Sequence, residues 1–396
     1  MTMRFQRLFL QCIVLYVIGV ASVWINPLFT LSATLIATAI SYRNQKDFTF
    51  ILTALFSGAL HIAFHPNMQG VYAVYVLILG GWSIAHVLST RRSKRLGSLG
   101  VAFLFLIDAL VLRMLDATTL LEGLQGLLVI ASAFVFYFLI VNAFKPRASL
   151  LNEIGLIGVF MLVLAMTMTA LTVVYNVTTG PFIHYIVLVG VIVSGHMMIT
   201  IKQGYWLMAL YVAAGVVLLI AGALVSAISV FIVTIFSGAY ALFKNPKTRL
   251  RTLGVSALSY LLTATLLMVG VNRGYVAPFT QSAREKLLIV SDSAKNAAEE
   301  FINAPIIGLA WLEGIDVSNI IVHMLSLGGL LVALFLYLQY RKIKVILKTD
   351  KIMRYFLIVL IIIGIGVHGI FEPLYFHPVY LLGLFTMIGA MEANAT

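Results

Sequence analysis

The chain is a succession of long apolar runs separated by short polar connections. Crossing the hydrocarbon core of a membrane takes a helix of about 20 apolar residues. By that measure the pattern predicts an all-α fold, a polytopic bundle of about 14 transmembrane helices, or 12 if the two shortest runs do not cross. The predicted spans are 7–25, 27–42, 48–65, 71–90, 98–115, 118–144, 151–175, 181–200, 204–222, 224–243, 250–272, 319–340, 352–371 and 376–391.

The amino-acid composition supports the prediction of a membrane protein. Hydrophobic residues make up 62% of the chain and charged residues 10%, against about 45–50% and about 25% in soluble domains. The nine prolines all fall at or beside the predicted boundaries, where proline disturbs a helix least. Residues 1–396 are therefore predicted to form a single integral membrane domain. Its first span is expected to be retained rather than cleaved as a signal peptide.

The distribution of positive charge predicts how the chain is oriented. Alternate connections hold 21 of the 26 Lys and Arg residues. The opposite set holds only four, all inside segment 273–318, and Arg113 lies within a span. Because Lys and Arg are enriched in cytoplasmic connections, both termini are predicted to be cytoplasmic and segment 273–318 extracytoplasmic. The net charge of +12 is then explained mainly by the enrichment of Lys and Arg on the cytoplasmic side. Contact with anionic lipid is the lesser explanation. The charge does not indicate binding to nucleic acid.

Segment 273–318 is the one long polar stretch between apolar runs. Ser282 and Glu285 have the spacing of a capping box, and apolar residues recur near the helical period behind them. We expect an amphipathic helix over 282–303, which Pro305 ends. It either lies over the outer mouth of the bundle or is simply a solvated helix.

Ionisable groups in or beside apolar runs are candidate site residues, because they are costly in lipid. Arg113 either pairs with Asp116 or binds an anion in an outer cavity through its fork of donors. Glu372 is either a solvated boundary carboxylate or a proton acceptor. With Arg273 and His323 these groups are predicted to lie at the outer side, where they would suit glycosyl transfer from a lipid pyrophosphate.

Several other chemistries lack a signal in the sequence. His61 and His65 are four residues apart but have no acidic neighbour, so we assign no metal site. No phosphate-binding glycine loop and no G-x-S-x-G motif is present. The lone Cys12 excludes a disulfide framework. No convincing repeat relates the two halves of the chain, which weighs against a transporter built from inverted repeats.

Two stretches of the last third resemble the O-antigen polymerase and ligase family of bacterial surface polysaccharides. The first stretch runs from Asn303-Ala304-Pro305-Ile306-Ile307-Gly308 through Asp316-Val317-Ser318-Asn319 into the glycine-containing span 320–340. The second is Phe371-Glu372-Pro373 before the final short run. Ser318 stands where ligase-like members often carry histidine, which favours the polymerase branch over the ligase.

The resemblance implies a metal-independent, inverting membrane glycosyltransferase that needs no cofactor. The expected catalytic residues are Glu372, which we favour as the base, and His323. The expected substrate-binding residues are Arg273, Arg113, Arg284 and Asn319.

The same resemblance implies the partners and the location. The substrate would be an undecaprenyl-pyrophosphate-linked oligosaccharide in the bacterial plasma membrane, with membrane lipid around the protein and a chain-length regulator protein as a further candidate partner. A flippase for the same lipid-linked units is the alternative from another class. The long outer segment favours the polymerase, because a flippase does not need one.

Overall fold

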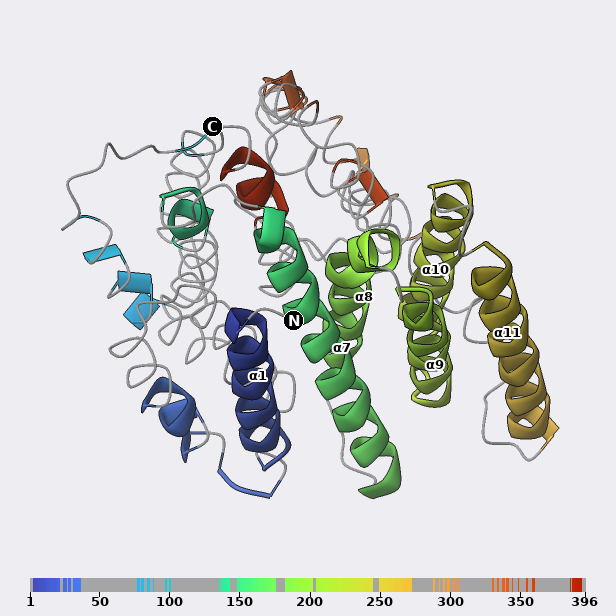
Figure 1. Cartoon of the computed structure of the whole chain (residues 1–396). Helices are drawn as coiled ribbons and strands as arrows, with labels where there is room; N and C mark the ends of the chain where they lie inside the picture. Colours follow the sequence, from blue (N-terminus) through green and yellow to red (C-terminus); the bar gives the residue numbers. More distant parts are fainter. Residues whose placement is uncertain are drawn as a thin grey trace. The chain divides into compact units, whose positions relative to one another are not determined.

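A computed structural model gives the fold of the parts of the chain described here (Figure 1). The described residues are 3–21, 24–26, 28–29, 31–36, 77–78, 80–81, 84–85, 88, 97, 100, 135, 137–142, 148–175, 182–201, 204–244, 249–272, 288, 292, 295, 298–299, 302, 305, 330, 333–334, 337–338, 340–341, 344, 348, 354, 358–359, 385 and 387–393. Within them the secondary structure is helical and no strand occurs, which confirms the predicted all-α class for this part of the chain.

The chain divides into two compact units, each assembled from two separate stretches. Unit 1 comprises 1–68 and 147–279, and unit 2 comprises 69–146 and 280–396. The labelled helices all belong to unit 1. They are α1 (Met3–Ala21), α7 (Ala148–Tyr175), α8 (Phe182–Thr200), α9 (Trp206–Ile220), α10 (Leu224–Lys244) and α11 (Arg249–Asn272).

Five of these helices begin and end within three residues of the predicted positions. The bounds of α1 differ more from the prediction. It begins four residues earlier than predicted, because the basic and polar residues before the apolar run continue the helix. It ends at Ala21, and the side chain of Asn26 then accepts a hydrogen bond from the backbone N–H of Leu28, 3.0 Å away. That bond satisfies one of the free donors at the start of the next helical stretch.

A glycine fixes the short connection between α9 and α10. Gly222 has a φ of +79°, a conformation in which other residues are strained. Its N–H donates to the carbonyl of Leu219, and the N–H of Ala223 donates to the carbonyl of Leu218. This is the Schellman arrangement that ends helices at a left-handed residue, and it turns the chain directly into α10.

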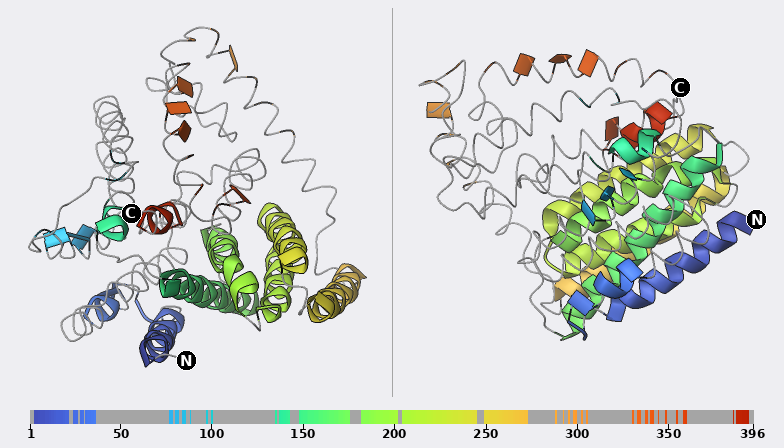
Figure 2. Two further views of the ribbon diagram at one scale, coloured as in Figure 1. Left: turned by 45° about the horizontal axis from the view of Figure 1, so that its top comes forward. Right: turned by 90° about the vertical axis from the view of Figure 1, so that its left-hand side faces the viewer.

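The core of unit 1 is built around α9. This helix carries no charged residue and is apolar on every side, a pattern typical of a helix that is surrounded by protein. It packs against α7, α8, α10 and α11, and Tyr211, Ala214 and Leu218 are fully buried. Figure 2 shows these helices side by side in two further views.

Helices α7 and α8 pack closely because each carries a glycine that faces the backbone of the other helix. A Cβ on Gly158 would lie 2.8 Å from the backbone nitrogen of Ser194, and one on Gly190 would lie 2.9 Å from that of Leu162. Small residues that allow such approach are typical of helix contacts in membranes.

Helix α1 packs on α7 and runs in the same direction. The hydroxyls of Tyr16 and Thr167 lie 3.0 Å apart, and each residue is in the C-terminal half of its helix. In Figures 1 and 2 the N-terminal ends of both helices lie at the same end of the pair.

Two described segments are long and apolar enough to cross a membrane. They are Asn152–Val174 in α7 and Val225–Phe243 in α10, and shorter apolar helices cover Phe9–Ile18, Ile186–Gly195 and Trp206–Ile220. In unit 2 the described residues are helical at positions inside the predicted spans 71–90, 118–144, 319–340 and 352–371. The last helix there extends to Ala393, two residues beyond the predicted end.

Candidate functional site

The site residues predicted from the sequence all lie outside the described residues, so their assignment stays a prediction. They are Glu372 and His323, proposed for catalysis, and Arg273, Arg113, Arg284 and Asn319, proposed for substrate binding. By position in the chain, five of the six belong to the two stretches that form unit 2, and Arg273 belongs to unit 1.

The predicted helix over 282–303 is supported wherever the structure describes it. Leu288, Asp292, Lys295, Glu299 and Ile302 are all helical and exposed. Both apolar and charged side chains of this helix are therefore open to their surroundings, and Pro305 follows in a turn. The exposure fits either reading of the helix, solvated or lying over the mouth of the bundle.

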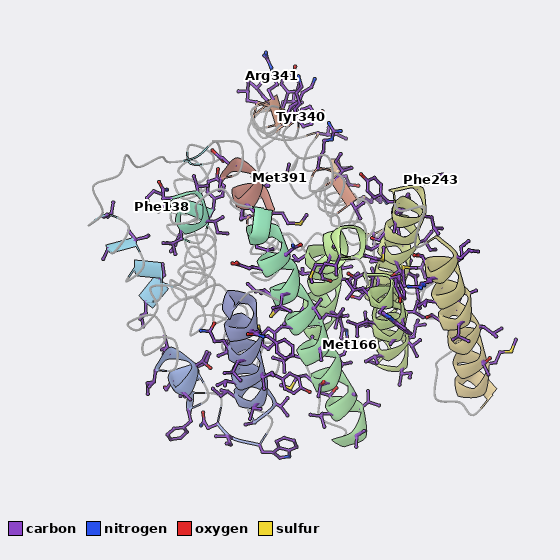
Figure 3. All side chains as sticks on the ribbon, in the orientation of Figure 1. Phe138, Met166, Phe243, Tyr340, Arg341 and Met391 are labelled. Carbon is purple, nitrogen blue, oxygen red and sulfur yellow. The ribbon has the colours of Figure 1, made fainter. Side chains whose placement is uncertain are left out.

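A buried polar pair joins the two stretches of unit 2. The hydroxyl of Tyr137, which is fully buried, donates a hydrogen bond to Oε2 of Glu392, which is 8% exposed. The two residues are 255 positions apart in the chain. Figure 3 shows the helices that carry them, marked by their neighbours Phe138 and Met391.

Three further residues among those described contact Tyr137. Phe385 packs against it edge to face, with ring centroids 6.2 Å apart. Gly389 lies against the ring, and a Cβ on Gly97 would lie 2.5 Å from the phenolic oxygen. Gly97 has a φ of +76°, so its backbone conformation and its contact with Tyr137 both favour glycine. The buried phenol and carboxylate thus join the two stretches of unit 2.

A second buried pair lies in unit 1, between α8 and α9. The hydroxyls of Ser194 and Tyr211 are 2.8 Å apart, and both side chains are fully buried. Ser194 also donates to the carbonyl of Gly190 at 2.6 Å. Because a serine hydroxyl has one proton, Tyr211 must be the donor in the bond to Ser194.

Sequence reasoning missed the buried carboxylates Glu392 and Glu153. Glu153 is 3% exposed near the start of α7. The signal was available, since Glu153 is the one acidic residue within the predicted span 151–175 and Glu392 directly follows the span 376–391. An ionisable group in or beside an apolar run is expected to face the protein interior.

The described residues contain no group of three or more His, Cys, Asp or Glu side chains that could hold a metal ion. Cys12, on α1, is buried, as expected of a small apolar residue.

Comparison with known proteins finds no family model, no curated protein and no solved structure that matches this chain. The features that bear on function are therefore the order of apolar and polar segments, the motifs of the last third and the contacts within each unit.

Proposed function

We propose that this chain is a multi-pass protein of the bacterial plasma membrane that polymerises lipid-linked oligosaccharide repeat units. The observation that carries the proposal is the polar segment 273–318 between apolar spans, together with the motif from Asn303 to Asn319 and the Phe371-Glu372-Pro373 ending. These are the features in which the sequence resembles the O-antigen polymerase and ligase family.

Several structural features support the membrane part of the proposal. Two of the described helices are long and apolar enough to span a bilayer. Large apolar side chains are exposed along the outer helices, including Leu10 and Val17 on α1 and Leu250, Leu258 and Met268 on α11. Apolar surface of this extent on a folded chain marks contact with lipid or with protein, and lipid contact is what a multi-pass bundle requires.

The direction of the helices also supports the proposed topology. Helices α1 and α7 run parallel, as expected if an even number of crossings separates their starting points. In unit 2, Gly97, Tyr137 and Glu392 lie together. The charge distribution predicts the cytoplasmic side for all three, because Gly97 and Glu392 border predicted cytoplasmic ends of spans and Tyr137 is in the predicted cytoplasmic half of span 118–144.

In the proposed reaction, Glu372 or His323 removes the proton of an acceptor sugar hydroxyl as its oxygen attacks the anomeric carbon of the donor. The bond from that carbon to the lipid pyrophosphate breaks, and the pyrophosphate leaves with the electron pair and with its lipid. Arg273, Arg113 and Arg284 would stabilise this leaving anion, since a guanidinium presents several donors to phosphate oxygens. Asn319 would bind the sugar or the pyrophosphate.

The proposal is tested by deleting the gene in its own host and separating the surface polysaccharide by size. A polymerase deletion leaves single repeat units and no polymer, and the plasmid-borne gene restores the ladder. Loss of all surface repeat units, with lipid-linked units retained on the cytoplasmic side, would instead identify a flippase. An unchanged polymer ladder in the deletion strain would refute both functions.

A further inference from the structure

The exposed face of α11 changes from charged to apolar along the helix. Arg251, in the first turn, is exposed. As far as Leu261, the residues exposed after it are all apolar: Leu253, Gly254, Ala257, Leu258 and Leu261. From Arg251 to Leu261 the helix rises about 15 Å, which is half of the hydrocarbon core of about 30 Å. This face therefore presents one cation followed by apolar surface about as long as one lipid leaflet.

The hydroxyl groups on this part of α11 find acceptors within the helix itself. Ser256 donates to the carbonyl of Thr252, 2.6 Å away, and the exposed Thr265 donates to the carbonyl of Leu261, 2.9 Å away. A hydroxyl that is satisfied in this way can meet hydrocarbon without leaving a polar group unpaired. A methyl group on Gly254 would meet nothing within 4 Å, so there is open space beside the helix one turn after Arg251.

The end of unit 1 that carries Arg251 is also rich in exposed aromatic side chains. Phe243 lies near the end of α10 and is exposed (Figure 3). The start of α9 is at the same end, because a Cβ on Gly238 would lie 2.8 Å from Cε of Met208. Trp206, the first residue of α9, is exposed as well. Exposed aromatic rings are typical of the level of the lipid headgroups.

Unit 1 contains few acidic groups that could neutralise its cations. The sequence from 154 to 284, which includes α8 to α11, has no Asp or Glu. Unit 1 as a whole has two acidic residues, Asp47 and Glu153, against eleven Lys and Arg. Glu153 is buried in α7. A basic surface with so few acidic neighbours attracts anions from outside the protein.

We propose that the exposed face of α11 binds an anionic phospholipid. The lipid phosphate contacts Arg251, whose guanidinium presents a fork of donors to phosphate oxygens. The acyl chains lie along Gly254, Leu258 and Leu261. Lys244 ends α10 and Arg249 begins α11, so both add positive charge near the headgroup. The inference depends on the membrane location of the chain and not on the proposed polymerase activity.

A second copy of the chain fits this face less well than a lipid does. Copies related by a rotation axis along the membrane normal keep each residue at the same depth. Two α11 helices packed face to face would therefore bring their Arg251 side chains to the same level. Like charges brought together in this way oppose association, whereas a lipid phosphate neutralises the arginine.

Native mass spectrometry of the purified full-length protein tests the proposal. The protein in detergent is titrated with phosphatidylglycerol and with phosphatidylcholine of identical acyl chains. The parent should bind phosphatidylglycerol more tightly. Arg251→Gln should weaken its binding about tenfold, as expected when one charge-assisted hydrogen bond at an exposed site is lost, and should leave phosphatidylcholine binding unchanged. Arg251→Lys should lose less, because it keeps the charge.

Arg341→Gln is the matched control. Arg341 is also exposed on a helix and belongs to unit 2, so its loss changes the net charge of the protein by the same amount. This variant should keep the parental affinity for phosphatidylglycerol. The lipid-free melting temperatures of all variants should match that of the parent, because both arginines are exposed.

Several results would overturn the proposal. One is equal affinity of the parent for the two lipids, and another is an equal loss of affinity in Arg341→Gln and Arg251→Gln. Inorganic phosphate that binds as tightly as phosphatidylglycerol would show that the acyl chains do not contribute. Efficient disulfide dimerisation of Leu258→Cys in a Cys12→Ser background would assign the face to a second copy. The titration uses no oligosaccharide, so failure of the polymerase function would leave its result unchanged.

Discussion

At the scale of single residues, the buried hydroxyls of unit 1 have unequal roles. Ser194 donates to the carbonyl of Gly190 on its own helix, so it keeps a partner whatever happens at Tyr211. Tyr211 comes from the next helix, and the oxygen of Ser194 is its hydrogen-bond acceptor. Tyr211, whose side chain reaches from one helix to the other, therefore depends on this hydrogen bond more than Ser194 does.

This asymmetry predicts the order of two substitutions. Tyr211→Phe loses one net hydrogen bond, about 0.6 kcal/mol for such bonds between membrane helices. Ser194→Ala leaves a buried phenolic hydroxyl without its acceptor and should cost about 1–3 kcal/mol. The double variant should cost less than the sum of the two. Unfolding by a denaturing detergent measures these differences, and a larger loss for Tyr211→Phe than for Ser194→Ala would contradict the donor assignment.

At the scale of elements, the sequence predicts the helices of unit 1 well and their contacts poorly. The bounds of α7 to α11 follow from uninterrupted apolar runs that end at polar or turn-forming residues, such as Gly222. The pattern does not reveal which faces meet, because runs such as α9 are apolar on every side. The pattern also does not predict the contact of Tyr137 with Glu392, because a contact between residues far apart in the chain produces no periodicity in the local sequence.

The close contact of α7 with α8 predicts a strong position dependence for glycine substitutions. Gly158→Ala and Gly190→Ala each place a methyl group within 3.0 Å of backbone atoms, which cannot move without separating the helices. Each should destabilise the protein by about 1–3 kcal/mol.

Gly254→Ala on α11 is the matched control for these variants. It meets nothing within 4 Å and should stabilise its helix by up to about 1 kcal/mol, the difference in helix propensity between alanine and glycine. Thermal unfolding in detergent compares all three variants. Equal stability of Gly158→Ala and Gly254→Ala would show that the two helices do not approach at Gly158.

At the scale of the whole molecule, the predicted topology governs what the site residues can do. The positive-inside rule predicts that segment 273–318 is extracytoplasmic and that both termini are cytoplasmic. Hydropathy and charge predict this much without any knowledge of which spans touch. Hydropathy and charge do not show whether the predicted site residues converge, because this depends on how distant spans pack. These residues are Arg113, Arg273, His323 and Glu372.

Labelling of single cysteines tests the topology. In a Cys12→Ser background, Ser293→Cys should react with a membrane-impermeant maleimide in intact spheroplasts, whereas Ser93→Cys should react only after permeabilisation. Both positions follow from the charge pattern of the chain. Labelling of Ser93→Cys in intact spheroplasts would contradict the predicted orientation.

Elongation of a lipid-linked repeat unit by the purified protein in lipid vesicles tests the proposed function most directly. The parent should build a ladder of polymer with a metal chelator present. Arg273→Ala should slow elongation about a hundredfold, as expected when a charge-assisted contact to a developing anion is lost. Arg273→Lys should restore only part of the rate, because lysine lacks the fork of donors of the guanidinium. Glu372→Gln should abolish elongation while donor binding persists; if His323→Gln alone does so, the base is His323. A well-folded parent that binds the lipid-linked unit and moves it across the vesicle membrane, but never joins two units, would contradict the polymerase.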